Sequence, residues 1–161
     1  RSSDLKKKLS GIYQHKVHHR KTPLVRGFDD VFLAPHSRNT EISAREISRH
    51  KEITVLGDSD EAGVFLAIAE NGRKIFVTGH PEYDRNTLDY EYKRDLKKGL
   101  DPDIPKNYYP DDDPNNRPVL TWRGHANTLY TNWLNYYVYQ TTPYDITRIR
   151  SDKQDQGRKE S

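Results

Sequence analysis

A histidine and a glutamate stand two residues apart where a strand-like run meets a helix-like stretch. Residues 75–78 lead into Gly79, His80, Pro81 and Glu82. Histidine is the side chain best suited to move protons near neutral pH, and a nearby carboxylate can hold one imidazole tautomer and stabilise the imidazolium. His80 and Glu82 are therefore predicted to be a general base and its orienting partner. The alternative is a turn histidine beside a glutamate that favours the N-terminus of the following helix.

The nucleophile that such a pair would serve is not a thiol of this chain. The sequence contains no cysteine, which excludes a disulfide framework, cysteine-ligated zinc and thiol catalysis by these residues alone. It also contains no methionine, at position 1 or elsewhere, so we expect a sequence that begins internally. The pattern predicts an enzyme whose nucleophile lies in another part of the protein.

Composition bounds the class of protein. The 161 residues suit one domain, and 32% hydrophobic residues is low for a self-sufficient core of that size. The net charge of +3, with both signs interleaved, is too weak for a dedicated nucleic-acid binder. No apolar run approaches bilayer-spanning length, and the N-terminus lacks the apolar core of a signal peptide. We expect a soluble, cytoplasmic protein with no nucleic-acid or membrane partner.

The hydrophobic pattern predicts the strands that must position these residues. Asn71 and Gly72 both tolerate a positive φ and predict a hairpin between the last two strands. The expected strands are 10–17, 31–34 (closed by 35–38), 53–56, 64–69 and 74–78.

Helices are expected at 43–50, from an N-cap at Asp84 to a stop at Gly99, and at 127–139. The proline-rich segment 101–118 is predicted to be an ordered loop. We expect one domain over 1–146 and a polar, disordered tail over 147–161. Strands alternating with helices favour an α/β layer architecture.

Longer strings around the His-Pro-Glu turn carry a resemblance to one family. They are KLSG (8–11), RGFDD (26–30), FLAPHSR (32–38), VTGHPEYD (77–84), GLDPD (99–103), NYYP (107–110) and TNWLNYYVYQ (131–140). In this order, over about 8–146, the chain resembles the homoserine O-succinyltransferases and O-acetyltransferases of methionine biosynthesis. His-Pro-Glu after a strand is also similar to the closing motif of class I glutamine amidotransferase-like folds. The resemblance implies the C-terminal half of a flavodoxin-like, three-layer α/β sandwich.

The resemblance also implies roles for five residues. His80 matches the family's general base and Glu82 its partner carboxylate. Arg94 matches the arginine that holds the homoserine carboxylate, a contact that suits its planar fork. Ser37 and Lys8 match substrate-contacting residues. From the residues alone, the preferred interpretation of Arg94 is a solvated helix charge that pairs with its neighbours Tyr90 or Asp95. The corresponding alternatives are a turn hydroxyl for Ser37 and part of a solvated basic run for Lys8.

By the same resemblance, an acetyl or succinyl group passes from acyl-CoA to a cysteine and then to the hydroxyl of L-homoserine. Acetyl-CoA or succinyl-CoA is then a co-substrate, and no permanently bound cofactor or metal is expected. The cysteine of the family lies on a strand-to-helix elbow that has no counterpart here. This polypeptide alone is therefore expected not to turn over.

Two other functions stay open. One is a glutamine amidotransferase domain, and the other is a non-catalytic interaction remnant that pairs with a separate chain. His15, His18 and His19 lack the ligand spacing of a metal site. Basic residues at 6–8, 20 and 21 suit coenzyme A phosphates or RNA, but a solvated face explains them as well. The aromatic-rich helix at 127–139 suits the core and also a subunit interface, so a homodimer of the full-length enzyme is a further expectation.

Overall fold

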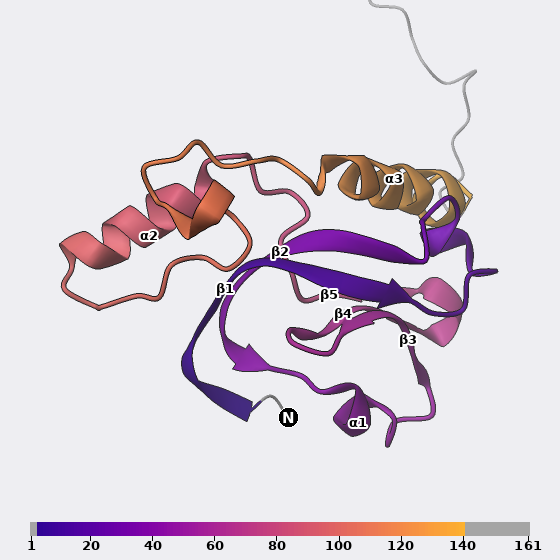
Figure 1. Ribbon diagram of the computed structural model, residues 1–161. Helices are drawn as coiled ribbons and strands as arrows, with labels where there is room; N and C mark the ends of the chain where they lie inside the picture. Colours follow the sequence, from indigo (N-terminus) through magenta and orange to yellow (C-terminus); the bar gives the residue numbers. More distant parts are fainter. Residues whose placement is uncertain (1–2, 141–161) are drawn as a thin grey trace, which may run out of the picture.

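Residues 3–140, which the computed structural model describes, form a curved antiparallel sheet with helices on its faces and at one end (Figure 1). The sheet order is β2-β1-β3-β4-β5, and every strand pair is antiparallel. The strands are β1 (Ser3–Val17), β2 (Val31–Glu41), β3 (Ile53–Ser59), β4 (Gly63–Ala69) and β5 (Lys74–Val77).

The helices follow the pattern that the sequence predicts, with shifted ends. They are α1 (Ala44–Ile47), α2 (Thr87–Lys97) and α3 (Arg123–Trp133), which continues as a π-helical turn, η4 (Leu134–Val138). Short 3₁₀ turns are η1 (Pro23–Val25), η2 (Glu70–Gly72) and η3 (Pro110–Asp112). The predicted tail, 147–161, lies outside the described residues.

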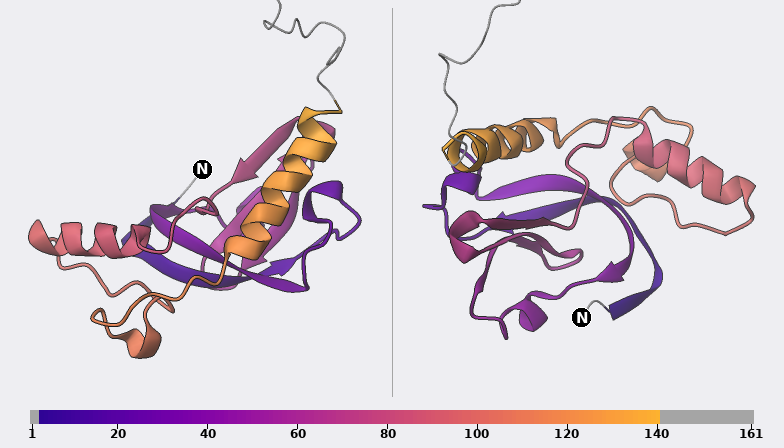
Figure 2. Two further views of the ribbon diagram at one scale, coloured as in Figure 1. Left: turned by 90° about the horizontal axis from the view of Figure 1, so that it is seen from above. Right: turned by 180° about the vertical axis from the view of Figure 1, so that it is seen from behind.

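The mixed α/β class is confirmed, but the layers of a flavodoxin-like sandwich are not shown by these residues. A doubly wound sheet is mostly parallel, with helices on both faces. Here the strand pairs are antiparallel, α3 lies along one face of the sheet and α2 projects beyond its end (Figure 2). The three-layer arrangement therefore stays a prediction for a longer protein.

The prediction that 35–38 close the second strand is wrong. The strand β2 continues through Pro35 to Glu41, because β1 pairs with it from Ile12 opposite Pro35 to Leu9 opposite Arg38. Proline has no N–H to donate to a ladder, but it is tolerated in an edge strand, and β2 is at the edge of the sheet. Ser37 is consequently held on a strand and not in a turn.

Local turn chemistry was predicted more reliably. Asn71 and Gly72 have φ of 56° and 88° between β4 and β5, and Gly99 ends α2 with φ of 69°, as predicted. Asp84 is not the N-cap of α2, which is Asn86. The Asp84 carboxylate instead pairs with Arg123 at 3.2 Å.

The buried side chains form two clusters on either side of the turn after β5. One packs η1, β2, β3 and β4 against α3 and contains Phe32, Leu56, Phe65 and Leu129. The other lies beneath α2 and the proline-rich loop; its members are Ile12, Leu88, Tyr108, Tyr109 and Trp122. The His-Pro-Glu turn thus lies between two clusters of closely packed side chains.

The predicted loop at 101–118 is ordered because it docks on β1. The Lys106 amide donates to the Ser10 carbonyl at 3.0 Å, and the Ile12 amide donates to the Lys106 carbonyl at 2.8 Å. This approach requires Gly11, which has φ of 145° and where a Cβ would lie 2.9 Å from the Lys106 Cα. The loop therefore closes the sheet end that carries Lys8 and Ser10. Among residues 3–140, no helix is both long and apolar enough to cross a bilayer.

Candidate active site

The His80 and Glu82 side chains form the contact that their spacing predicts. The His80 Nδ1 lies 2.8 Å from the Glu82 Oε1, and the two side chains are 34% and 54% exposed. With Nδ1 engaged by the carboxylate, the tautomer that keeps the Nδ1 proton leaves Nε2 as the basic nitrogen. The pair can accept a proton at Nε2 and stabilise the resulting imidazolium.

Backbone contacts fix the turn that carries this pair. The His80 amide donates to the Pro35 carbonyl at 2.8 Å, and the Tyr83 amide donates back to the His80 carbonyl at 3.1 Å. The buried Trp122 indole N–H donates to the Tyr83 carbonyl at 2.9 Å. Gly79 permits the close passage of the chain, since a Cβ there would lie 2.8 Å from the Phe65 ring. Both core clusters therefore position the His80 imidazole.

Tyr83 joins the dyad to a second group of polar residues. Its ring stacks on the His80 imidazole, with centroids 4.3 Å apart and an interplanar angle of 13°. Its hydroxyl donates to the Glu91 Oε1 at 2.7 Å. Burial, and then the hydrogen bond to Glu91, raise the pKa of the Tyr83 hydroxyl, so it remains a donor at neutral pH. One side chain thus touches both the proton-transfer pair and the α2 network.

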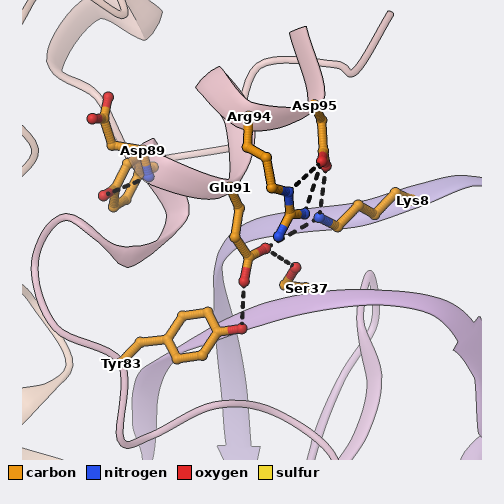
Figure 3. Close-up of polar contacts among 8 residues, drawn as sticks. Lys8, Ser37, Tyr83, Asp89, Glu91, Arg94 and Asp95 are labelled. Atoms are coloured by element: carbon orange, nitrogen blue, oxygen red, sulfur yellow. Dashed lines mark hydrogen bonds and ion pairs between the residues drawn. The ribbon is translucent and has the colours of Figure 1, made fainter. Parts of the chain in front are cut away.

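Glu91 is the centre of that network (Figure 3). Its Oε2 accepts from the Ser37 hydroxyl and from the Lys8 Nζ at 3.1 Å. Burial alone would raise the pKa of the Glu91 carboxyl, but the hydrogen bonds from Ser37, Tyr83 and Lys8 outweigh it and lower the pKa. Glu91 is therefore an anion at neutral pH, with a side chain that is only 18% exposed.

Asp95 binds both of the positively charged side chains that are predicted to contact the substrate, Lys8 and Arg94. The Arg94 Nε and a terminal guanidinium nitrogen lie 2.9 and 2.7 Å from the Asp95 Oδ1, and the Lys8 Nζ lies 3.2 Å from its Oδ2. The hydrogen bond from Arg94 is the largest cause of a lowered Asp95 pKa, with Lys8 adding to it against the effect of burial. Lys8 and Arg94 also line one groove of about 590 Å³.

The register of β1 explains how Lys8 reaches α2. The pairing of β1 with β2 shifts between Asp4 and Leu9, and Lys8 lies within this irregular stretch. Such irregularities bend a strand and re-aim a side chain, and they are common beside active sites. The structure thus brings Lys8, Ser37 and Arg94 together from β1, β2 and α2, next to the turn that carries His80 and Glu82.

The comparisons with known proteins agree with this arrangement. The model of the homoserine O-succinyltransferase family matches residues 1–144. The chain belongs to this family. The resemblance seen in the motifs from KLSG to TNWLNYYVYQ is therefore confirmed at the level of the family.

Curated members of the family include both acyl specificities by name. The chain is 65% identical over 142 residues to the homoserine O-acetyltransferase of Lachnospira eligens, covering 88% of the chain and 46% of the relative. It is 53% identical over 147 residues to the homoserine O-succinyltransferase of Vibrio campbellii, covering 91% and 47%. The chain spans about half the length of these relatives.

A solved structure shares the fold at low sequence identity. The crystal structure of SMU.1228c aligns with a TM-score of 0.53 and 14% identity, covering 81% of the present chain and 53% of the other. This likeness concerns the fold alone, and it again extends over about half of the other chain.

Three members of the candidate site were not predicted from the sequence to be site residues: Tyr83, Glu91 and Asp95. The spacing of Glu91, Arg94 and Asp95 was available as a signal, since positions three and four apart share one face of a helix. Tyr83 directly follows Glu82 but carries no spacing rule of its own. Only the fold shows that this helix face meets β1 and β2.

The three histidines at the end of β1 do not form a cluster. His15 is buried and its Nε2 lies 2.9 Å from the Nε2 of His36, whereas His18 pairs with Asp58 at 2.7 Å. Among the described residues, no group of three or more His, Cys, Asp or Glu side chains is arranged to hold a metal ion.

Proposed function

We propose that this chain is the C-terminal part of a homoserine O-acyltransferase and supplies its proton-transfer pair and its amino-acid pocket. In the complete enzyme, a cysteine outside this sequence takes an acetyl or succinyl group from acyl-CoA. The acyl group then passes to the hydroxyl of L-homoserine. The observation that carries the proposal is the Glu91 network beside the His80–Glu82 pair: Glu91 accepts from Lys8, Ser37 and Tyr83. Arg94 joins this network through Asp95, which also binds Lys8.

His80 serves both half-reactions. When the cysteine attacks the acyl-CoA, the His80 Nε2 accepts the thiol proton and passes it to the departing thiolate of coenzyme A. It then accepts the hydroxyl proton of homoserine as that oxygen attacks the acyl-enzyme, and returns it to the released cysteine thiolate. Glu82 holds the Nδ1 proton and stabilises the charged ring. A covalent acyl-enzyme of this kind predicts ping-pong kinetics. The dyad is partly open to solvent here, and a further part of the protein must exclude water from the acyl-enzyme.

The pocket matches a zwitterionic amino acid. Lys8 and Arg94 contribute two positive charges, Glu91 and Asp95 two negative ones, and all four side chains are joined by hydrogen bonds. Asp95 holds the side of the Arg94 guanidinium that carries Nε. We assign the end of the guanidinium formed by its two terminal nitrogens to the homoserine carboxylate, and the exposed Arg94 side chain lines the 590 Å³ groove. Glu91 then offers an anionic oxygen to the ammonium group. No permanently bound cofactor is needed, and we expect the enzyme in the cytoplasm as part of methionine biosynthesis.

The test is to restore the missing part and measure catalysis. The chain is joined to the remaining segment of the Lachnospira eligens relative, in the order that the relative has them. Release of coenzyme A from acetyl-CoA or succinyl-CoA is then followed with and without L-homoserine. We expect homoserine-dependent release. A folded, restored protein with no release contradicts the proposal, and ammonia release from glutamine instead would indicate an amidotransferase.

A further inference from the structure

The orientation of Arg94 depends on the residue that follows it in α2. Successive residues of a helix point in directions about 100° apart, so adjacent side chains do not face each other. The Arg94 guanidinium nevertheless reaches the Asp95 carboxylate, with its Nε at 2.9 Å and a terminal nitrogen at 2.7 Å from the Asp95 Oδ1. The Arg94 side chain therefore turns back across the helix towards Lys8 of β1, as Figure 3 shows.

Asp95 is better fixed than the arginine that it binds. Its side chain is 9% exposed, and its Oδ2 also accepts from the Lys8 Nζ at 3.2 Å. The Arg94 side chain is 53% exposed, and within residues 3–140 no second carboxylate pairs with it. An arginine side chain has many rotamers, and an exposed one without a fixed partner populates several of them. The contact with Asp95 thus selects the orientation of Arg94 before any ligand binds.

This contact leaves one end of the guanidinium available. Asp95 occupies the side that carries Nε, so the end formed by the two terminal nitrogens remains for a carboxylate in the groove that Arg94 lines. A side chain that is already ordered loses less conformational freedom when a ligand binds, which favours binding. Lys8 is fixed in a similar way, by Asp95 and by Glu91. Asp95 therefore arranges both cations of the pocket.

We propose that Asp95 is a positioning residue for the acceptor substrate: it fixes Arg94 and Lys8 in the arrangement that a substrate carboxylate meets, and so makes the groove prefer acceptors that carry this carboxylate. Asp95 acts through these two side chains and not by touching the substrate. The effect on substrate preference rests on the proposed function, whereas the ordering of Arg94 does not depend on any activity.

A second buried aspartate of α2 provides a matched comparison. The Asp89 side chain is 12% exposed, pairs with Lys93 at 2.9 Å and accepts from the Tyr109 hydroxyl at 2.7 Å. None of these three residues lines the groove that contains Arg94. Figure 3 shows Asp89 apart from the Glu91 network. Asp89 and Asp95 thus share residue type, helix, burial and a basic partner, but of the two it is Asp95 that contacts the pocket.

The first test compares Asp95→Asn with Asp89→Asn in the restored enzyme. Asparagine keeps the shape of the side chain but removes its charge. For Asp95→Asn, we expect the KM for L-homoserine to rise about 10-fold with kcat less affected, and the KM for 2-amino-1,4-butanediol, which lacks the carboxylate, to stay unchanged. Asp89→Asn should change neither KM. In Arg94→Lys, adding Asp95→Asn should raise the KM for homoserine less than about 2-fold further, because both substitutions act on the same contact.

The second test observes Arg94 directly and needs no turnover. The Nε–H resonance of Arg94 is assigned by its absence in Arg94→Lys, and its ¹⁵N relaxation is measured. We expect an ordered side chain in the restored enzyme and in Asp89→Asn, and a mobile one in Asp95→Asn. If Asp95→Asn does not fold, Asp95→Ser takes its place.

Equal changes of the KM for homoserine in Asp95→Asn and Asp89→Asn overturn the proposal. An equal rise of the KM for both acceptors, or an Arg94 side chain that stays ordered in Asp95→Asn, overturns it as well. A restored protein that releases no coenzyme A contradicts the proposed function. The relaxation of Arg94 then still decides the role of Asp95, because a mobile guanidinium in Asp95→Asn supports it and an ordered one excludes it.

Discussion

Two histidine–glutamate pairs with the same spacing have different surroundings in this molecule. His50 and Glu52, between α1 and β3, lie 3.4 Å apart with side chains that are 60% and 64% exposed. His80 and Glu82, after β5, lie 2.8 Å apart and are 34% and 54% exposed. The second histidine is stacked on Tyr83, and its turn is tied to buried elements. His-x-Glu spacing alone therefore does not make a site; the surrounding fold does.

The largest expected difference between the two pairs is in turnover. In the restored enzyme, His80→Ala should lower kcat/KM for homoserine about 10³-fold, because the nucleophile and the hydroxyl lose their base. His50→Ala should change it less than about 2-fold. Steady-state release of coenzyme A measures both. Because exposed ion pairs contribute roughly 0–1 kcal/mol, neither variant should unfold the protein. Equal losses for the two variants would remove the distinction.

A third pair, His15 and His36, is buried, and it predicts a stability that depends on pH. His15 and His36 are fully buried, with Nε2 atoms 2.9 Å apart. Burial lowers the pKa of His15 to about 4, and burial together with His15 lowers that of His36. In the unfolded chain these two imidazoles bind protons below about pH 6.5, whereas in the folded chain they stay neutral to a lower pH. Stability is therefore complete above about pH 6.5 and falls as the pH drops towards 4.

The expected loss at pH 4 is on the order of 3 kcal/mol for His15. Urea denaturation between pH 7 and pH 4 measures it. The double variant His15→Leu/His36→Leu should flatten this dependence, since replacing both partners by apolar groups leaves no unpaired nitrogen. His50→Ala should leave it unchanged. The same slope in the double variant would show that the buried pair is not its cause.

Substitution of Arg94 tests the proposed amino-acid pocket beside the His80–Glu82 pair. Arg94→Lys keeps the charge but loses the planar fork, so the KM for homoserine should rise about 10-fold with kcat less affected. Arg45→Lys, on α1 near the His50 pair, is the matched control and should leave KM unchanged. Initial rates at varied homoserine concentration measure both. An unchanged KM for Arg94→Lys would exclude a bidentate carboxylate contact.

The smallest effect is expected for the link between the dyad and the pocket. Tyr83→Phe keeps the ring on His80 but removes the hydrogen bond to Glu91, and should lower kcat/KM roughly 3- to 10-fold, as the loss of about 1 kcal/mol for one net hydrogen bond suggests. Tyr90→Phe, on the exposed side of α2, is the control. Initial rates of coenzyme A release at low homoserine concentration measure both variants. No difference between them would show that the dyad and the pocket act separately.

Local signals in the sequence predicted much of the fold. The turn at Asn71 and Gly72 and the stop at Gly99 depend only on backbone φ, and both were correct. The continuation of β2 through Pro35 was not predictable locally, because it depends on pairing with a strand more than twenty residues earlier. His80 and Glu82 were identified by spacing and by resemblance, and their contact has the predicted geometry.

The Glu91 network could not be predicted from the sequence for a related reason, since it too depends on long-range contacts. Glu91, Arg94 and Asp95 share a helix face, but many solvated helices show such spacing. Their importance depends on Lys8 and Ser37, which arrive from β1 and β2. Only the register of two strands and the packing of α2 bring these five side chains together. Long-range contacts of this kind decide which charged residues belong to a pocket.

The most direct test of the central claim is a single-turnover measurement on the restored enzyme. It is mixed with acyl-CoA in the absence of homoserine, and free coenzyme A is followed in time. The account predicts a burst of one coenzyme A per active site, retained in His50→Ala and slowed about 10³-fold in His80→Ala. A burst of equal rate in His80→Ala would contradict the assignment of His80 as the base.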